Sequence, residues 1–306
     1  MRRLGWLGGA VMLGTMWLMV AVAGPPVTAQ VPAPTGSSSR DLPARWDELT
    51  ASDWPAALDR SKGVAILPIG VLEKHGPQAP IGADLIRARG YAARAAEEEY
   101  AVVFPDYFYG QIYEARHQPG TFALPSELIW ELLQATCDEI ARNGFDKILI
   151  VNGHGGNPNF LRFFVQAQLE KRRDYAVYLH EPAHDPAFAE RLSAARRSDP
   201  EEDLHGGERE TSELLYLRPE LVQLERSGDE SGDDQRRLGL AELYTGIWWF
   251  ASYPNHYAGD ASVSSRELGE LIVEHRVDSI VRALRTIKDD ARTLELQEEF
   301  FDRVLN

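Results

Sequence analysis

The sequence has a single cysteine, Cys137, among its 306 residues, so no disulfide can form within the chain. Cys137 lies in the helical pattern SELIWELLQATCDEIARNG, beside acidic rather than basic side chains. A reactive thiol needs positively charged neighbours that lower its pKa. We therefore expect a half-buried, unreactive thiol, and a disulfide-framed fold is excluded.

Positive charge is also scarce, because 32 Lys and Arg residues stand against 47 Asp and Glu residues and give a formal net charge of −15. A surface of this sign repels nucleic acids and anionic membranes, and we expect neither as a partner. Phosphate-binding motifs of the G-x-G-x-x-G and Walker types are missing as well.

The apolar run that approaches the length of a membrane span follows Arg2 and Arg3 and ends in small residues, AVA and then VTA. A basic start, an apolar core and such an end predict a secretory signal peptide over residues 1–29. An uncleaved N-terminal anchor is the alternative, since about 20 apolar residues can span a bilayer. Either way we expect an exported protein, periplasmic or secreted, without other membrane contact.

Residues 30–45 are rich in Pro, Ser and Gly, which predicts a flexible linker, and residues 46–306 are expected to form one folded domain. Within this domain the runs VAILPIGVL, AVVFPDYF, KILIVNG and YAVYLH have the composition of buried strands. Helical patterns lie between them, and an amphipathic helix, SSRELGELIVEHRVDSIVRALRTIKDD, follows later. This alternation predicts an α/β fold with a mostly parallel sheet.

Two polar motifs directly follow predicted strands. Glu73 and His75 come after VAILPIGVL, and His154 stands in NGHGGN after KILIV. Ligands collect at the carboxyl ends of parallel strands, and side chains two residues apart in an extended segment face the same way. A metal site is therefore one interpretation; a solvated loop histidine and a phosphate-binding turn are the plain alternatives.

Two further carboxylates complete the candidate set. Asp84 opens the next predicted helix, where it could equally serve as an N-cap. Glu210 lies in DLHGGERETSELLYLRPEL, on the apolar face of a helix predicted from about residue 207 to residue 217. A carboxylate on that face is costly unless it is paired or metal-bound. We expect Glu213 to be a surface charge, paired with Arg209 at i,i+4 spacing.

The set Glu73, His75, Asp84, His154 and Glu210 suits two divalent ions, with zinc expected first and manganese or iron as alternatives. Paired ions lower the pKa of a shared water and generate a hydroxide that attacks amide or ester carbonyls.

The motifs ExHGPxxPxGxD, NGHGGN, HGGExETS and HQPGT, in this order over residues 63–287, resemble those of the creatininase (creatinine amidohydrolase) family. The resemblance implies a single three-layer α/β/α domain and a homo-oligomer, commonly a hexamer. It implies that Glu73, Asp84 and His154 hold one metal and that His75, Asp84 and Glu210 hold the other. By the same resemblance, His117 lies in a substrate-side loop.

The chain departs from creatininases that act on creatinine. Their tyrosine and glutamate after the strand-end histidine correspond to Gly155 and Gly156, and a tryptophan that covers the substrate corresponds to Glu201. Creatinine is therefore not expected as the substrate, and we expect Gly155 and Gly156 to border a different substrate pocket. The NGHGGN motif resembles the corresponding motif of the wider family, whose members include a mycofactocin precursor peptidase.

The sequence thus predicts an exported dinuclear-metal amidohydrolase that cleaves a C–N bond of a small amide, a cyclic amide or a short peptide. His205 and Glu208 are the residues we expect to assist proton transfer, and the resemblance places His205 near the substrate. A mycofactocin-type peptidase and a non-catalytic metal- or solute-binding protein on the same fold are the alternatives.

Overall fold

The computed structural model describes residues 41–304. The signal peptide or anchor predicted over residues 1–29 and most of the predicted linker lie outside the described residues. Contacts group the described residues from Leu42 onward into one unit. No helix within residues 41–304 combines the length and the apolar character needed to cross a membrane.

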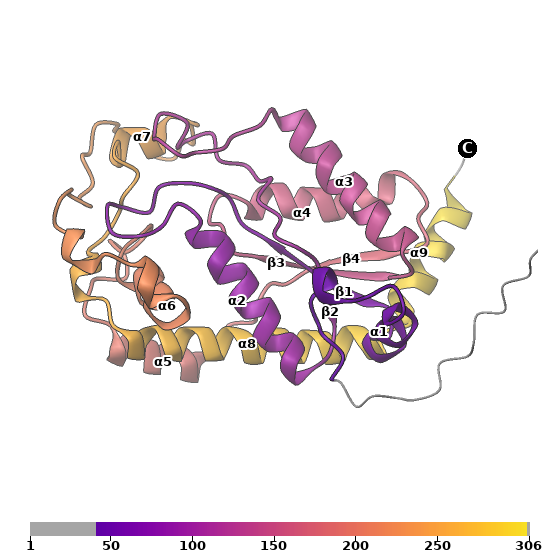
Figure 1. The fold of residues 1–306 in the computed structure, drawn as a ribbon. Helices are drawn as coiled ribbons and strands as arrows, with labels where there is room; N and C mark the ends of the chain where they lie inside the picture. The colour runs from indigo at the N-terminus through magenta and orange to yellow at the C-terminus, as the bar shows by residue number, and fades with distance from the viewer. Residues whose placement is uncertain (1–40, 305–306) are drawn as a thin grey trace, which may run out of the picture. The chain divides into compact units, whose positions relative to one another are not determined.

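Four parallel strands form the central sheet in the order β2-β1-β3-β4 (Figure 1). The two central strands, β1 (Val64–Ile69) and β3 (Lys147–Asn152), pair along their whole length, from Val64 opposite Lys147 to Ile69 opposite Asn152. The flanking strands β2 (Val102–Val103) and β4 (Ala176–Leu179) are shorter. The predicted α/β fold with a parallel sheet is confirmed.

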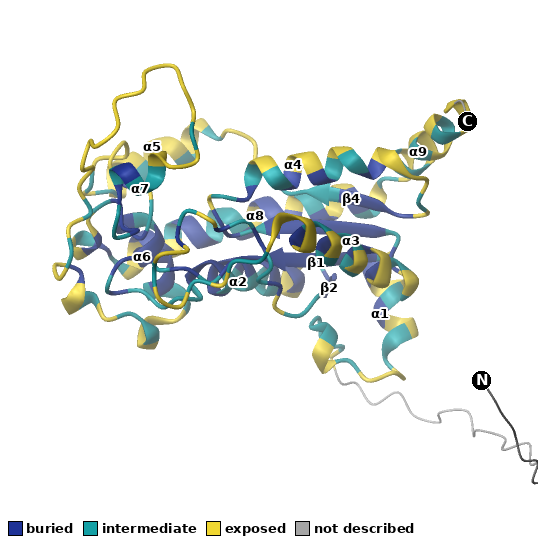
Figure 2. Ribbon diagram, turned by 90° about the horizontal axis from the view of Figure 1, so that it is seen from above, coloured by how far each residue is buried: buried dark blue, intermediate teal, exposed yellow. Residues whose placement is uncertain are grey.

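Helices cover both faces of this sheet (Figure 1). The alternating side chains of β1 divide between two cores: Ala65, Leu67 and Ile69 face one, and Val64 and Ile66 face the other. The first core is closed by α1 (Trp54–Ser61), α3 (Ser126–Arg142) and α4 (Pro158–Ala167). The second is closed by α2 (Ala83–Glu98) and α8 (Arg266–Asp289). Figure 2 shows the strands buried between these layers.

The remaining helices lie at the ends of the layers. They are α5 (Pro186–Ala195), α6 (Glu208–Leu217), α7 (Trp248–Ser252) and α9 (Arg292–Arg303), with short 3-10 turns at Trp46–Glu48, Gln168–Glu170, Pro219–Leu221, Leu224–Arg226 and Ala261–Val263. Of these, α6 packs closely on α8 because Gly269 offers no side chain at the contact with the Ser212 backbone.

Cys137 lies fully buried in the first core, deeper than the half-buried position expected. Burial raises the pKa of its thiol to about 12, so the side chain is protonated and unreactive at neutral pH, as predicted.

Candidate metal centre

Four short segments bring polar side chains to the carboxyl end of the sheet. Glu73 and His75 lie in the loop after β1, and His154 lies directly after β3. Asp84 and Glu210 lie in the first turns of α2 and α6. None of the five residues is more than 6% exposed, so the structure brings all five predicted metal ligands together in the protein interior.

Three of their atoms converge without a hydrogen-bond partner among the described residues: Glu73 Oε1, Asp84 Oδ2 and His154 Nδ1. His154 Nδ1 is 2.8 Å from Glu73 Oε1 and 3.0 Å from Asp84 Oδ2. The other ring nitrogen, Nε2, lies 2.8 Å from the Gln111 carbonyl oxygen and so carries a proton in the neutral ring. Buried polar atoms rarely lack partners, and these three lone-pair atoms fit a divalent cation.

The carboxylates around His154 favour its protonated form when no metal is bound. Burial lowers the pKa of His154, but the adjacent Glu73 and Asp84 carboxylates outweigh burial and raise that pKa well above its usual value. The same holds for His75, whose pKa burial lowers but Asp84, Glu73 and Glu210 raise to about 9. Metal binding therefore has to displace protons from both imidazoles.

A second group of ligand atoms comes from His75, His205 and Glu210, all within 4.8 Å of one another. His75 Nε2 lies 3.1 Å from Asp84 Oδ1 and 3.7 Å from Glu210 Oε2. Asp84 thus presents Oδ2 to the first group and Oδ1 to the second, as a bridging carboxylate would.

His205 reaches this centre through a backbone contact. Its Nε2 lies 2.8 Å from the Lys74 carbonyl oxygen, which leaves Nδ1 as a proton acceptor 3.8 Å from Glu210 Oε2. Burial, together with His75, lowers the pKa of His205 to about 4, so the ring is neutral at pH 7. The next residue, Gly206, has φ of +67°, and a side chain there would meet the His75 backbone at 2.7 Å. Only glycine allows this approach.

His256 also lies in the centre, although the sequence pattern assigned it no role. It is 1% exposed, its Nε2 is 2.5 Å from Glu73 Oε2, and Trp249 donates its indole N–H to His256 Nδ1 at 2.8 Å. Burial is the main cause that lowers the pKa of His256 to about 3. His256 lies 183 positions from Glu73 along the chain, and no local sequence pattern predicts a contact over that separation.

A buried arginine borders the second group. Arg87 donates to Glu210 Oε1 at 2.7 Å and to Glu213 Oε2 at 3.2 Å. The prediction that Glu213 is a surface charge paired with Arg209 is therefore wrong, since Glu213 is only 2% exposed and also contacts the Tyr91 hydroxyl. The reason is that α6 packs against both α2 and α8, so more than one of its faces is covered.

Glu208 turns away from the centre. Its carboxylate accepts hydrogen bonds from the backbone N–H of Arg197 at 3.0 Å, from that of Ser198 at 2.8 Å and from the Ser198 hydroxyl at 2.6 Å. These contacts hold the segment before α6 in place. The catalytic role predicted for Glu208 finds no support in this position.

The three predicted substrate-side residues differ in their surroundings. His117 is exposed and donates from Nε2 to the Pro254 carbonyl oxygen at 2.6 Å, so it ties two loops together. Around Gly155 a side chain would meet nothing within 4 Å. At Gly156 it would meet His154 Nε2 at 2.5 Å and Glu114 Oε1 at 3.0 Å. Substrate contact by these residues stays a prediction.

Residues 47–284 match the Creatininase family model, which is described as creatinine amidohydrolase. The chain belongs to the creatininase family. The predicted enzyme class, a metal-dependent hydrolase of carbon–nitrogen bonds, is confirmed by this membership.

Known relatives of the chain differ in their substrates. It is 29% identical to a creatinine amidohydrolase of Pseudomonas putida over 256 residues, which cover 78% of this chain and 95% of the relative. It is 30% identical over 165 residues to a mycofactocin precursor peptide peptidase of Mycolicibacterium smegmatis, covering 52% of this chain and 60% of that one.

Solved creatininase structures share the fold. A mutant creatininase of the Zn–Zn type aligns with a TM-score of 0.68 and 27% identity, over 81% of this chain and 99% of that one. A creatininase described as the Mn form aligns with a TM-score of 0.67 and 26% identity, over 81% and 100% of the two chains.

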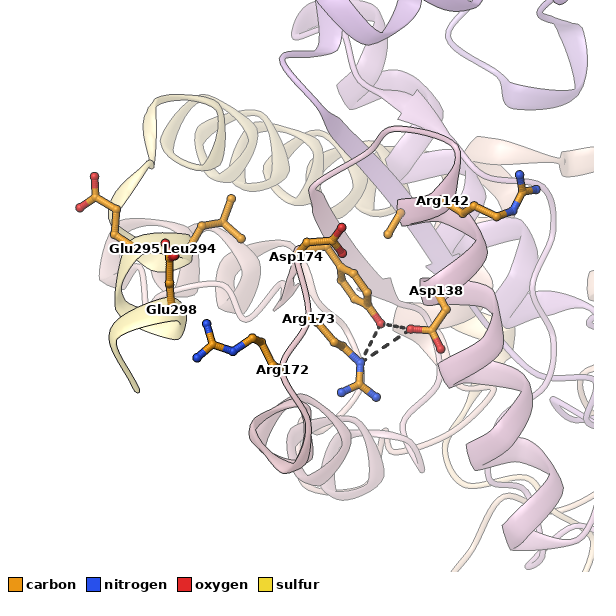
Figure 3. Close-up of a pocket in the computed structure, with 10 residues that line it drawn as sticks. Asp138, Arg142, Arg172, Arg173, Asp174, Leu294, Glu295 and Glu298 are labelled. Carbon is orange, nitrogen blue, oxygen red and sulfur yellow. Dashed lines mark hydrogen bonds and ion pairs between the residues drawn. The ribbon is translucent and has the colours of Figure 1, made fainter. Parts of the chain in front are cut away.

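A separate cavity of about 950 Å³ lies near the amino end of β4, between residues of α3, of α9 and of the segment that leads into β4 (Figure 3). Its arginines already have partners: Arg172 binds Asp302, Arg173 lies 3.0 Å from the Tyr175 hydroxyl, and Arg142 forms an ion pair with Glu139. Because these charges are paired and none of the centre's ligands lines the cavity, it is not a second candidate active site.

Proposed function

We propose that the chain is an exported amidohydrolase with two divalent metal ions, acting on a small amide, a cyclic amide or a short peptide. The observation that carries this proposal is the convergence of three buried, unpartnered ligand atoms from Glu73, Asp84 and His154, with the second oxygen of Asp84 turned to a second ligand group.

In this proposal Glu73, Asp84 and His154 hold one ion, and His75, Asp84 and Glu210 hold the other, with His205 beside it. Divalent ions at these positions supply the Lewis acidity that activates water. The donor set of imidazole and carboxylate suits zinc, manganese or iron, and related structures described as Zn–Zn and Mn forms support the first two.

We assign proton transfer to Glu114 rather than to Glu208. The Glu114 side chain is half-buried, and its Oε1 lies 3.0 Å from the position that a side-chain carbon would take at Gly156. Gln111 donates to its other oxygen at 2.6 Å, which aligns the carboxyl group. Glu114 would take a proton from the attacking water and pass it to the leaving nitrogen as the C–N bond breaks.

His205 has the complementary role. With Nε2–H bonded to the Lys74 carbonyl oxygen, its Nδ1 can accept a hydrogen bond or a proton but has none to give in the neutral ring. We therefore assign His205 to orientation of the substrate or of the attacking water.

The open space around Gly155 is where we place the entry to the site. Creatinine is not the substrate we propose, because the side chains that the resemblance associates with it are replaced here by Gly155, Gly156 and Glu201. Peptide cleavage is the second candidate, supported by the 30% identity to a mycofactocin precursor peptide peptidase.

Self-association is part of the proposal. Apolar side chains crowd an exposed segment before α7, with Leu243 69% exposed, Tyr244 85% and Ile247 56%. Contact between copies of the chain would cover such side chains. We propose a homo-oligomer, a hexamer by resemblance, and light scattering coupled to size-exclusion chromatography measures its mass.

Turnover of an amide panel tests the enzymatic proposal. Zinc-loaded protein should hydrolyse at least one member among cyclic amides, formamides and short peptides, and His154→Ala should abolish this turnover. Release of terminal residues from peptides alone would select the peptidase. Tight metal binding without turnover of any panel member would favour the non-catalytic binding protein.

A further inference from the structure

Two side chains in the centre have no role in the function proposed above: His256 and Trp249. The Trp249 indole N–H can only donate, and it lies 2.8 Å from His256 Nδ1. Nδ1 must therefore accept with its lone pair, and in the neutral ring the proton stands on Nε2. Trp249 thus selects the tautomer of His256.

The protonated Nε2 of His256 points at Glu73. It lies 2.5 Å from Glu73 Oε2, while Glu73 Oε1 is the oxygen that faces His154 and Asp84 without a partner. The two oxygens of Glu73 are therefore distinguished: Oε2 is held by the hydrogen bond from His256, and Oε1 faces the other ligand atoms, 2.8 Å from His154 Nδ1.

The same contact argues against a third metal position. Glu73, His205 and His256 offer ligand atoms within 4.8 Å of one another. A metal there would need a lone pair on His256 Nε2. Because the lone pair on Nδ1 accepts the indole N–H of Trp249, Nε2 carries the proton of the neutral ring and has no lone pair to offer. The His205 nitrogen on that side, Nε2, donates to Lys74 as well. This third group is a hydrogen-bonded cluster.

The loop that carries His256 is held in an uncommon conformation. His256 has φ of +56°, a left-handed value that non-glycine residues seldom adopt. Contacts from elsewhere fix the loop: His117 and Gln118 both donate to the Pro254 carbonyl oxygen, at 2.6 and 2.9 Å, and Asn255 donates to the Ser231 carbonyl oxygen at 2.6 Å. Such local strain persists where surrounding contacts hold it, and it clusters at functional sites.

We propose that His256 is a positioning residue that holds Glu73 as a single-oxygen metal ligand, and that Trp249 orients His256 for this task. The inference rests on the metal centre of the proposed function. A carboxylate can bind a metal through one or both oxygens, and a donor fixed on Oε2 restricts Glu73 to Oε1. The first ion thereby keeps a coordination position open for water or substrate. Hydrogen-bond partners of metal ligands contribute about 10- to 100-fold to metal affinity or activity.

Zinc affinity, measured by competition with a chromophoric chelator, tests the proposal on the full mature chain. His256→Asn removes the donor, because asparagine tolerates the left-handed backbone but is too short to reach Glu73. We expect it to weaken the tighter zinc step by about 10- to 100-fold. His256→Gln places an amide N–H near the original Nε2 and should recover most of the affinity.

Trp249→Phe keeps an aromatic ring but removes the indole N–H, and it should weaken zinc binding in the same direction as His256→Asn, by less. Trp248→Phe is the matched control, since Trp248 is 39% exposed and has no hydrogen bond to a histidine in the described structure; it should bind zinc like the wild type. Thermal unfolding of the metal-free variants checks that each is folded.

A spectroscopic measurement separates positioning from general stability. The visible absorption of cobalt-substituted protein should lose intensity in His256→Asn, because two-oxygen binding by Glu73 raises the coordination number. Wild-type affinity and an unchanged cobalt spectrum in that variant would overturn the inference while leaving the metal centre intact. A wild-type chain that binds no zinc would instead overturn the proposed function, and this inference with it.

Discussion

The strongest test of the geometry around His154 is a single methyl group at Gly156. In Gly156→Ala the new carbon would lie 2.5 Å from His154 Nε2 and 2.7 Å from Gln111 Oε1. Non-bonded heavy atoms prefer separations of about 3.5–4.0 Å, so the imidazole must move by about 1 Å. His154 Nε2 is also the atom that donates to the Gln111 carbonyl oxygen, and that hydrogen bond must lengthen.

The consequence for the metal follows from this displacement. A ligand displaced by about 1 Å, with its supporting hydrogen bond weakened, should cost about 10- to 100-fold in zinc affinity, or about 1.4–2.8 kcal/mol. Gly155→Ala provides the matched control because a carbon at that position would meet nothing within 4 Å. We expect its zinc affinity to equal that of the wild type.

Competition with a chromophoric chelator measures both variants under the same conditions. Equal zinc affinities in Gly156→Ala and Gly155→Ala would refute the reasoning, because the open and the crowded glycine would then be equivalent. So would a Gly156→Ala variant that keeps wild-type zinc affinity.

Three further predictions concern protons. Zinc binding at pH 7 should release protons, because the carboxylates around His75 raise its pKa to about 9 despite burial. Calorimetry in buffers of different ionisation enthalpy measures this release, and a binding heat that does not depend on the buffer would contradict the prediction. Glu114→Gln should lower kcat by about 100-fold or more with unchanged zinc affinity, and an unaltered kcat would remove Glu114 from catalysis. The pKa of His180 is lowered to about 4, mainly by burial. Between about pH 4 and 6.5 the unfolded chain therefore binds more protons than the folded chain. The free energy of unfolding should rise with pH over this range, by at most about 3 kcal/mol. Urea unfolding at several pH values measures this rise, and His180→Gln should flatten it.

The central strands and the ligands that follow them were predictable from the sequence. VAILPI and KILIVN are short runs of Val, Ile and Leu, and they form the two buried strands of the sheet centre. Because parallel strands end at the same edge, the residues after them must meet, and Glu73 lies beside His154 as expected. AVVFPDYF was overestimated as a strand, since only Val102–Val103 pairs as β2.

Other parts of the site depend on tertiary contacts that no local pattern carries. Glu213 looked like a surface charge because a helix periodicity argument assumes one covered face, whereas α6 is enclosed by α2 and α8. His256 lies in a loop without periodicity, and its contact with Glu73 joins segments 183 positions apart. Glu208 belongs to the HGGExETS motif, but its carboxylate accepts hydrogen bonds from the backbone N–H groups of residues 197 and 198 and so points away from the metal centre.

The central claim is a paired-metal centre in which Asp84 serves both ions, and the zinc content per chain tests it most directly. Elemental analysis after zinc loading and dialysis should find two ions per wild-type chain and fewer than one in Asp84→Asn. His154→Ala, which removes a ligand of one ion only, should retain about one ion. Fewer than one ion per wild-type chain, or two ions retained by Asp84→Asn, would contradict the account.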